Sequence, residues 1–101
     1  MNQKRNTEFT LIVCHIEDAR LINQMLGTTK MDFILKDIAK FLEDTSKQSV
    51  FYLGSSTFVI TVYSGKNDSF KLLQTIEKRF EKPWFVDENC ITVSIRLMDI
   101  L

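Results

Sequence analysis

The chain has 101 residues, of which 45% are hydrophobic and 26% charged, as is typical of one small globular domain with a single core. Thirteen basic residues balance thirteen acidic ones, so net charge gives no general attraction to nucleic acid or anionic lipid. No apolar run reaches the length that spans a bilayer, and no signal peptide opens the chain. We therefore expect a cytoplasmic segment without membrane contact of its own, and the alternative is that it is the cytoplasmic part of a larger, membrane-associated protein.

The first half of the chain predicts one strand and two helices after a polar N-terminal tail over residues 1–8. Residues 9–16, FTLIVCHI, form an almost continuous apolar run, which predicts a central strand buried on both faces. Residues 17–26 have helical periodicity and end at Gly27, a residue suited to a helix C-terminus. Residues 31–45 carry a second apolar stripe with charges opposite, which predicts another amphipathic helix.

The second half begins with a predicted hairpin over residues 50–64, whose tip is the small polar stretch 54–57. A third helix is predicted over residues 70–80, with Asp68 or Ser69 as its N-cap. A last hairpin is expected over residues 84–100. It consists of a short strand that begins at residue 84, a polar turn and a second strand over residues 90–100.

This order of elements predicts a single domain over residues 9–101. Helices that alternate with a mainly antiparallel central sheet indicate an α+β sandwich of the ferredoxin-like or nucleotide-cyclase-like kind, with helices flanking the sheet.

Few side chains outside the turn suggest chemistry. Cys14 and Cys90 lie in apolar stretches and are interpreted as buried free thiols of a reducing compartment. His15 is the only histidine, and a hydrogen-bonded structural role is favoured over a ligand or a base. Phe70 is expected in the core, and Trp84 is expected to close the edge of the core rather than to anchor a partner.

Three stretches together resemble the GGDEF domain of diguanylate cyclases. The family signature Gly-Gly-(Asp/Glu)-Glu-Phe is matched in place by GSSTF, residues 54–58, followed by the strand-like VITV. Upstream, HIEDARLINQMLGTTKMD has the spacing of the family's Asp-x-Asp strand and the helix after it. Downstream, IEKRFEKPWFVDENCITVSI is similar to the family's helix, proline and hairpin, most closely in GGDEF domains found in tandem with EAL domains.

The resemblance implies that this chain is a degenerate member without catalysis. In active members, the first Asp of Asp-x-Asp and the acidic pair of the turn hold metal ions and help to activate the attacking hydroxyl. Those positions are His15, Ser56 and Thr57 here, and only Glu17 keeps a carboxylate. Mg²⁺ prefers carboxylate oxygens, so we expect no catalytic residue, no metal and no cofactor. The signature turn as a whole comprises Gly54, Ser55, Ser56, Thr57 and Phe58.

Two positions of the family's guanine site are retained, as Asn23 and Asp32. An amide and a carboxylate can read the guanine edge, although an Asp that simply begins a helix is the alternative for Asp32. The inhibitory Arg-x-x-Asp site corresponds to Thr45 and Gln48, which cannot make its charge-assisted contacts, so that site is expected to be absent.

The leading hypothesis is therefore an inactive GGDEF-like regulatory or dimerisation module in a cyclic-di-GMP signalling protein. The resemblance implies an EAL or sensory domain as partner, in the same chain or another, and a homodimer as one arrangement. The usual N- and C-terminal family segments are expected to be lacking. One alternative is a GTP-sensing domain without turnover, and another is an unrelated ferredoxin-like protein-interaction domain.

Overall fold

Nine helices and strands follow one another in the computed structural model, which describes residues 9–63 and 66–100. They are β1 (Thr10–Ile16), α1 (Ala19–Leu26), α2 (Thr28–Ser46), β2 (Val50–Gly54), β3 (Thr57–Val62), α3 (Lys66–Phe80), β4 (Trp84–Val86), β5 (Asn89–Ile91) and β6 (Ile95–Ile100). The predicted N-terminal tail lies outside the described residues.

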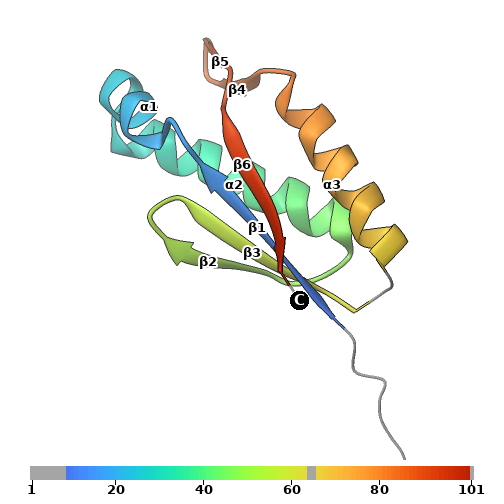
Figure 1. The fold of residues 1–101 in the computed structure, drawn as a ribbon. Coiled ribbons are helices and arrows are strands. Elements are labelled where there is room, and N and C mark those ends of the chain that lie inside the picture. Colours follow the sequence, from blue (N-terminus) through green and yellow to red (C-terminus); the bar gives the residue numbers. More distant parts are fainter. Residues whose placement is uncertain (1–8, 64–65, 101) are drawn as a thin grey trace, which may run out of the picture.

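Four strands form the main sheet in the order β2-β3-β1-β6, and each neighbouring pair is antiparallel (Figure 1). β1 lies inside this sheet, as its apolar sequence predicts, with Ile12 opposite Ile60 on one side and Asp99 on the other. The mixed architecture, an antiparallel sheet flanked by helices, confirms the predicted α+β class.

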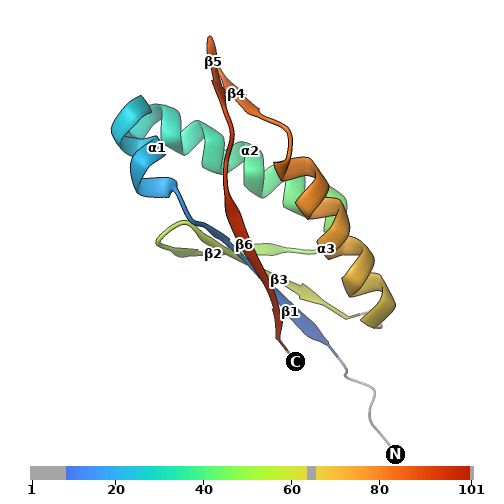
Figure 2. The ribbon, with the colours of Figure 1, turned by 45° about the horizontal axis from the view of Figure 1, so that its top comes forward.

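The two faces of the sheet differ in how they are covered. Ile12, Cys14 and Ile16 of β1 are fully buried on the face toward α2 and α3, together with Phe58 and Ile60 of β3. Figures 1 and 2 show both long helices on this one side of the sheet. The prediction that β1 is buried on both faces is therefore wrong, because its alternate residues remain half-buried on the other face.

Gly27 separates the first two helices. Its φ of 88° is a conformation that side-chain-bearing residues rarely adopt, and its N–H donates to the carbonyl of Asn23 at 2.8 Å. α2 then begins at Thr28, three residues before the predicted start. Its apolar stripe places Ile34, Ile38 and Leu42 in the core.

α3 begins earlier than the sequence predicts. Asp68 and Ser69 lie inside the helix, so neither is its N-cap, and part of the predicted polar turn falls on residues 64–65, outside the described residues. The prediction that Phe70 is in the core is wrong, because Phe70 lies on the exposed side of α3 and is 61% exposed. Ile76 and Phe80 occupy the core as predicted.

The predicted last hairpin is divided in two. β5 pairs with β4 in a small separate sheet that projects beyond α2, whereas β6 joins the main sheet beside β1 (Figure 2). Trp84 of β4 is buried and lies 5.1 Å from Phe80 and 6.0 Å from Phe41 between ring centroids. The indole thus closes the edge of the core, as predicted, and Arg79 stacks on its ring at 3.7 Å.

Neither cysteine forms a disulfide, but only Cys14 is buried, and the prediction that Cys90 is buried is wrong. Cys90 is the central residue of the three-residue strand β5, in the projecting sheet, and does not face the main core. Burial raises the pKa of the Cys14 thiol from 9.0 to about 12.

We predict that Ellman's reagent at pH 8 labels the native protein once, at Cys90, and labels Cys14 only after unfolding in guanidinium. Cys14 stays neutral in the fold at pH values where the unfolded thiol ionises. Its contribution to the free energy of unfolding is therefore complete below about pH 9 and is lost as the pH rises toward 12. A Cys90→Ser variant is the control, and rapid labelling of that variant in its native state would contradict the prediction.

Candidate functional site

The turn between β2 and β3 is built on three successive residues in left-handed backbone conformations. Gly54, Ser55 and Ser56 have φ angles of 87°, 50° and 57°. Positive φ at both central residues matches the twist of a two-residue hairpin turn, but it strains residues that carry a side chain. A register shift between Tyr52 and Gly54 marks a bulge just before the turn. Tyr52 stabilises this geometry, because its hydroxyl oxygen accepts the Ser56 N–H at 3.0 Å.

The turn lies directly beside the end of β1. Thr57 is opposite His15 in the β1–β3 register, and the Ile16 N–H donates to the Ser56 carbonyl at 3.0 Å. His15 Nδ1 lies 2.9 Å from Thr57 Oγ1, and the Thr57 hydroxyl donates to the Ser55 carbonyl at 3.2 Å. Since the hydroxyl has one proton, that second bond makes Nδ1 the donor in the first. His15 is therefore hydrogen-bonded, and the prediction that its role is structural stays a prediction.

β6 supplies a residue to this site that the sequence does not reveal. Arg96 is opposite His15 on the other side of β1, and its guanidinium lies 3.0 Å from the Glu17 carboxylate. The Glu17 N–H also donates to the Ser94 carbonyl at 2.9 Å, and the Ser94 N–H donates to the Asp18 carboxylate at 3.2 Å. Only the pairing of β1 with β6 brings these residues together, and no spacing in the sequence shows that pairing.

These side chains do not fit a divalent metal ion. The turn contributes hydroxyl groups, and His15 is bonded to Thr57. Of the two carboxylates, Glu17 pairs with Arg96 and Asp18 accepts the Ser94 N–H. Mg²⁺ needs several oxygen ligands in octahedral arrangement and is usually held by carboxylates. Across residues 9–63 and 66–100, no group of three or more His, Cys, Asp or Glu side chains is placed to hold a metal ion.

The two residues that the resemblance assigns to a guanine site lie on consecutive helices. Asn23 is exposed on α1, and Asp32 is exposed on α2, which packs against α1. Asp32 is the fifth residue of α2, past the first turn, so the alternative that it begins the helix is wrong. Both side chains are therefore accessible to a ligand.

The two residues that the resemblance aligns with the inhibitory site lie at the other end of α2. Thr45 is half-buried in its last turn, and Gln48 follows in the link to β2. The Gln48 N–H donates to the Ser46 hydroxyl at 3.1 Å, which uses this backbone group locally. Neither residue carries a charge that could bind a phosphodiester.

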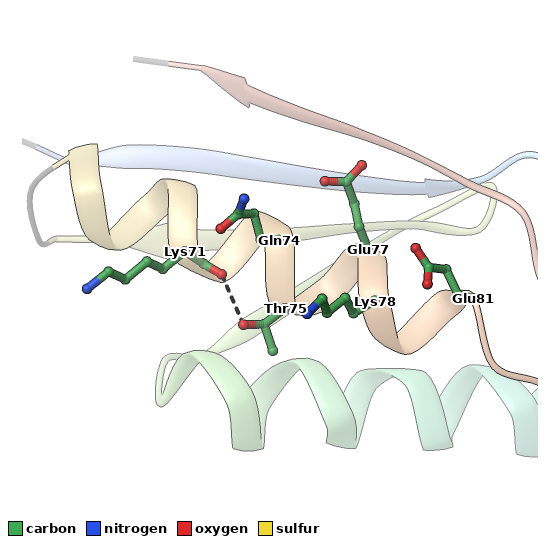
Figure 3. A pocket seen from close by; sticks show the side chains of 6 residues that line it. All are labelled: Lys71, Gln74, Thr75, Glu77, Lys78 and Glu81. Carbon is green, nitrogen blue, oxygen red and sulfur yellow. Dashed lines mark hydrogen bonds between the residues drawn. The ribbon is translucent and has the colours of Figure 1, made fainter.

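A surface hollow on α3 does not have the features of a second functional site. Figure 3 shows its lining, which comes from this one helix and consists of Lys71, Gln74, Thr75, Glu77, Lys78 and Glu81. The Thr75 hydroxyl donates to the Lys71 carbonyl one turn earlier at 3.0 Å, so it is no free nucleophile. Mixed charges along one exposed helix face are typical of a solvated surface. The turn remains the candidate site.

Comparison with known proteins identifies a family and several solved structures that this chain resembles. The family model described as "Diguanylate cyclase, GGDEF domain" matches residues 1–97. A diguanylate cyclase/phosphodiesterase structure from Caldicellulosiruptor saccharolyticus has a TM-score of 0.84 and 20% identity, over 96% of this chain and 60% of that chain. An EAL/GGDEF domain protein from M. capsulatus has a TM-score of 0.83 and 16% identity, over 98% and 66%.

The active GGEEF domain of a diguanylate cyclase from Vibrio cholerae is also similar, with a TM-score of 0.71 and 25% identity over 92% of this chain and 62% of that one. Among curated proteins, none matches the sequence. The α+β fold and the hairpin beside β1 define a cyclase-like domain. The chain belongs to the GGDEF family, and it spans about 60% of the length of the first of these solved chains.

We predict that Ser55→Gly raises the free energy of unfolding by about 0.5–1 kcal/mol, because glycine adopts the left-handed conformation without strain. Gly54→Ala should lower it by about 1 kcal/mol for the opposite reason, although a Cβ there meets no atom within 4 Å. Urea unfolding followed by circular dichroism measures both values. Ser55→Ala is the matched control and should change stability by less than about 0.5 kcal/mol. A destabilised Ser55→Gly variant would show that the turn does not have this backbone.

Proposed function

We propose that this chain is a catalytically inactive GGDEF domain that acts as a regulatory or dimerisation module in a cyclic-di-GMP signalling protein of the cytoplasm. One observation carries the proposal. At the place where the signature requires an acidic pair, the turn presents the hydroxyls of Ser56 and Thr57, and Thr57 is bonded to His15.

This arrangement lacks the groups that the reaction of the family needs. Joining two nucleoside triphosphates requires negative charge to be neutralised on the phosphates and a proton to be removed from the attacking hydroxyl. Glu17 is the carboxylate nearest in sequence to the His15 position, and it pairs with Arg96 at 3.0 Å. His15 uses Nδ1 to bond Thr57. Without metal-binding acids, we expect neither of these steps to be assisted.

Because such a domain retains the fold, we propose that it acts through contacts with other domains. The sheet, the two long helices and the hairpin beside β1 are kept while the acids are replaced. The Caldicellulosiruptor saccharolyticus protein is described as a diguanylate cyclase/phosphodiesterase. The M. capsulatus protein is described as an EAL/GGDEF domain protein. We therefore propose that this module works beside an EAL or sensory domain and alters that domain's activity.

The purified protein, incubated with GTP and Mg²⁺, should form no cyclic-di-GMP above a protein-free control in a chromatographic assay. A His15→Asp, Ser56→Asp, Thr57→Glu variant should bind Mg²⁺ at least about tenfold more tightly, because it restores three carboxylates beside β1. Its matched control is His15→Asn, Ser56→Asn, Thr57→Gln, which has nearly the same shape without the charge. Product formed by the wild-type chain would refute the proposal of inactivity.

A second candidate function, guanine sensing, is favoured by the exposure of Asn23 and Asp32 on adjacent helices. Calorimetric titration with GTP should then give a dissociation constant in the micromolar range, about −8 kcal/mol or somewhat weaker. The Asn23→Ala, Asp32→Ala double variant should bind GTP at least about tenfold more weakly, because both guanine contacts are lost. Equal affinity of the double variant and the wild type would remove this candidate, and ATP is the control ligand.

A further inference from the structure

The turn of the β4–β5 hairpin contacts the start of α2. Lys30, the third residue of α2, donates from Nζ to the Asn89 side-chain oxygen at 3.2 Å, and the same Nζ lies 4.0 Å from the Asp87 carboxylate. Lys30 and Asn89 are 59 positions apart in the chain. Lys30, Asp87 and Asn89 are here called the strap, because they tie the hairpin to the helix.

The first turn of α2 has little stabilisation of its own. Its N-cap is Gly27, which makes no side-chain hydrogen bond to the helix start, and the first turn contains no acidic residue. Lys30 instead places a cation near the positive end of the helix dipole, which is unfavourable. The Asp87 carboxylate offsets this charge from outside the helix. The start of α2 therefore depends on the hairpin for its negative charge.

The hairpin is attached to α2 at two points (Figure 2). At its base, Trp84 is buried and packs against Phe41 of α2, with 6.0 Å between the ring centroids. At its turn, the strap reaches Lys30, three turns earlier in the same helix. Since two points fix a direction, the strap sets how the hairpin lies relative to the first half of α2.

Asp87 has a backbone conformation that is strained for a residue with a side chain. Its φ is 53°, and it is the first residue of the two-residue turn that follows Val86, which pairs with Asn89. Glycine adopts this conformation without strain, and Asp and Asn tolerate it better than most residues. A carboxylate at this position carries a backbone cost, and its contact with Lys30 offsets part of that cost.

The strap acts on the corner between α1 and α2, here defined as residues 23–32. Two backbone hydrogen bonds cross this corner. The Gly27 N–H donates to the Asn23 carbonyl at 2.8 Å, and the Met31 N–H donates to the Gly27 carbonyl at 3.1 Å. Lys30 directly precedes Met31, so the strap holds the backbone where the second of these bonds forms. Without it, an uncapped helix start frays readily.

We propose that the β4–β5 hairpin is a conformational device that controls the order of the corner. While the strap is closed, the start of α2 is held. When the hairpin moves away, the corner, which includes Asn23 and Asp32, opens locally. The side chains of Lys30 and Asp87 are 40% and 71% exposed, and contacts this exposed are weak, so the strap opens without unfolding of the domain. The device concerns the backbone alone, so it depends neither on guanine binding nor on the proposed inactivity.

Native-state hydrogen exchange of the full chain, followed by NMR, tests the strap. Lys30→Met removes both contacts and should speed exchange of the Gly27 and Met31 amides about three- to tenfold, while the amides of β1 keep their rates. The sign is informative, because removal of a cation from a helix start would by itself slow this exchange. Lys36→Met, the same change at an exposed position further along α2, is the matched control and should leave the corner unchanged.

A second variant isolates the charge. Asp87→Asn keeps the shape of the side chain and its tolerance of the left-handed conformation, and should speed exchange at the corner about two- to threefold. The double variant Lys30→Met, Asp87→Asn should exchange no faster than Lys30→Met alone, because Asp87 acts through Lys30.

Four outcomes would overturn the proposal. The first is unchanged or slower exchange of the Gly27 and Met31 amides in Lys30→Met. The second is an equal increase in Lys36→Met, since the effect would then follow any loss of charge from α2. The third is an equal increase at the amides of β1, which would mean general destabilisation. The fourth is a double variant whose increase is the product of the two single increases, since Asp87 would then act independently of Lys30.

Discussion

The pairing of β1 with both β3 and β6 is the constraint on which the rest of this structure depends. One face of β1 contributes Ile12, Cys14 and Ile16 to the core, where burial of apolar surface stabilises the contact with α2 and α3. The same two pairings determine which residues stand opposite each other at the end of the strand. The core and the candidate site are thus set by one register, and a shift of one residue would reverse both faces.

At the end of β1, this register brings polar side chains into a network of hydrogen bonds. His15, Thr57 and the Ser55 carbonyl form a chain of donors and acceptors, while Arg96 pairs with Glu17. Such a network satisfies polar groups that would otherwise be unpaired near the sheet. It also leaves few free acceptors for a cation. The polar side chains beside the turn are therefore bonded to one another.

The two faces of the sheet differ in how far their side chains are buried. The two long helices α2 and α3 cover one face. Trp84 packs against Phe41 and Phe80 and closes the edge of the core on that side. On the other face, Phe51, Met98 and Ile100 are about half exposed.

By itself, the sequence determined the order of elements, the central position of the first strand, the α+β class and the family, because apolar periodicity and motif spacing are local properties. It also located the turn, whose glycine and serines are typical turn residues. The exposure of Phe70 and Cys90 could not be predicted, because it depends on how α3 packs on the sheet and on the division between β5 and β6. Only the tertiary structure decided that Arg96 meets Glu17 and that alternate residues of β1 are half-buried, since pairing between distant strands leaves no mark in local spacing.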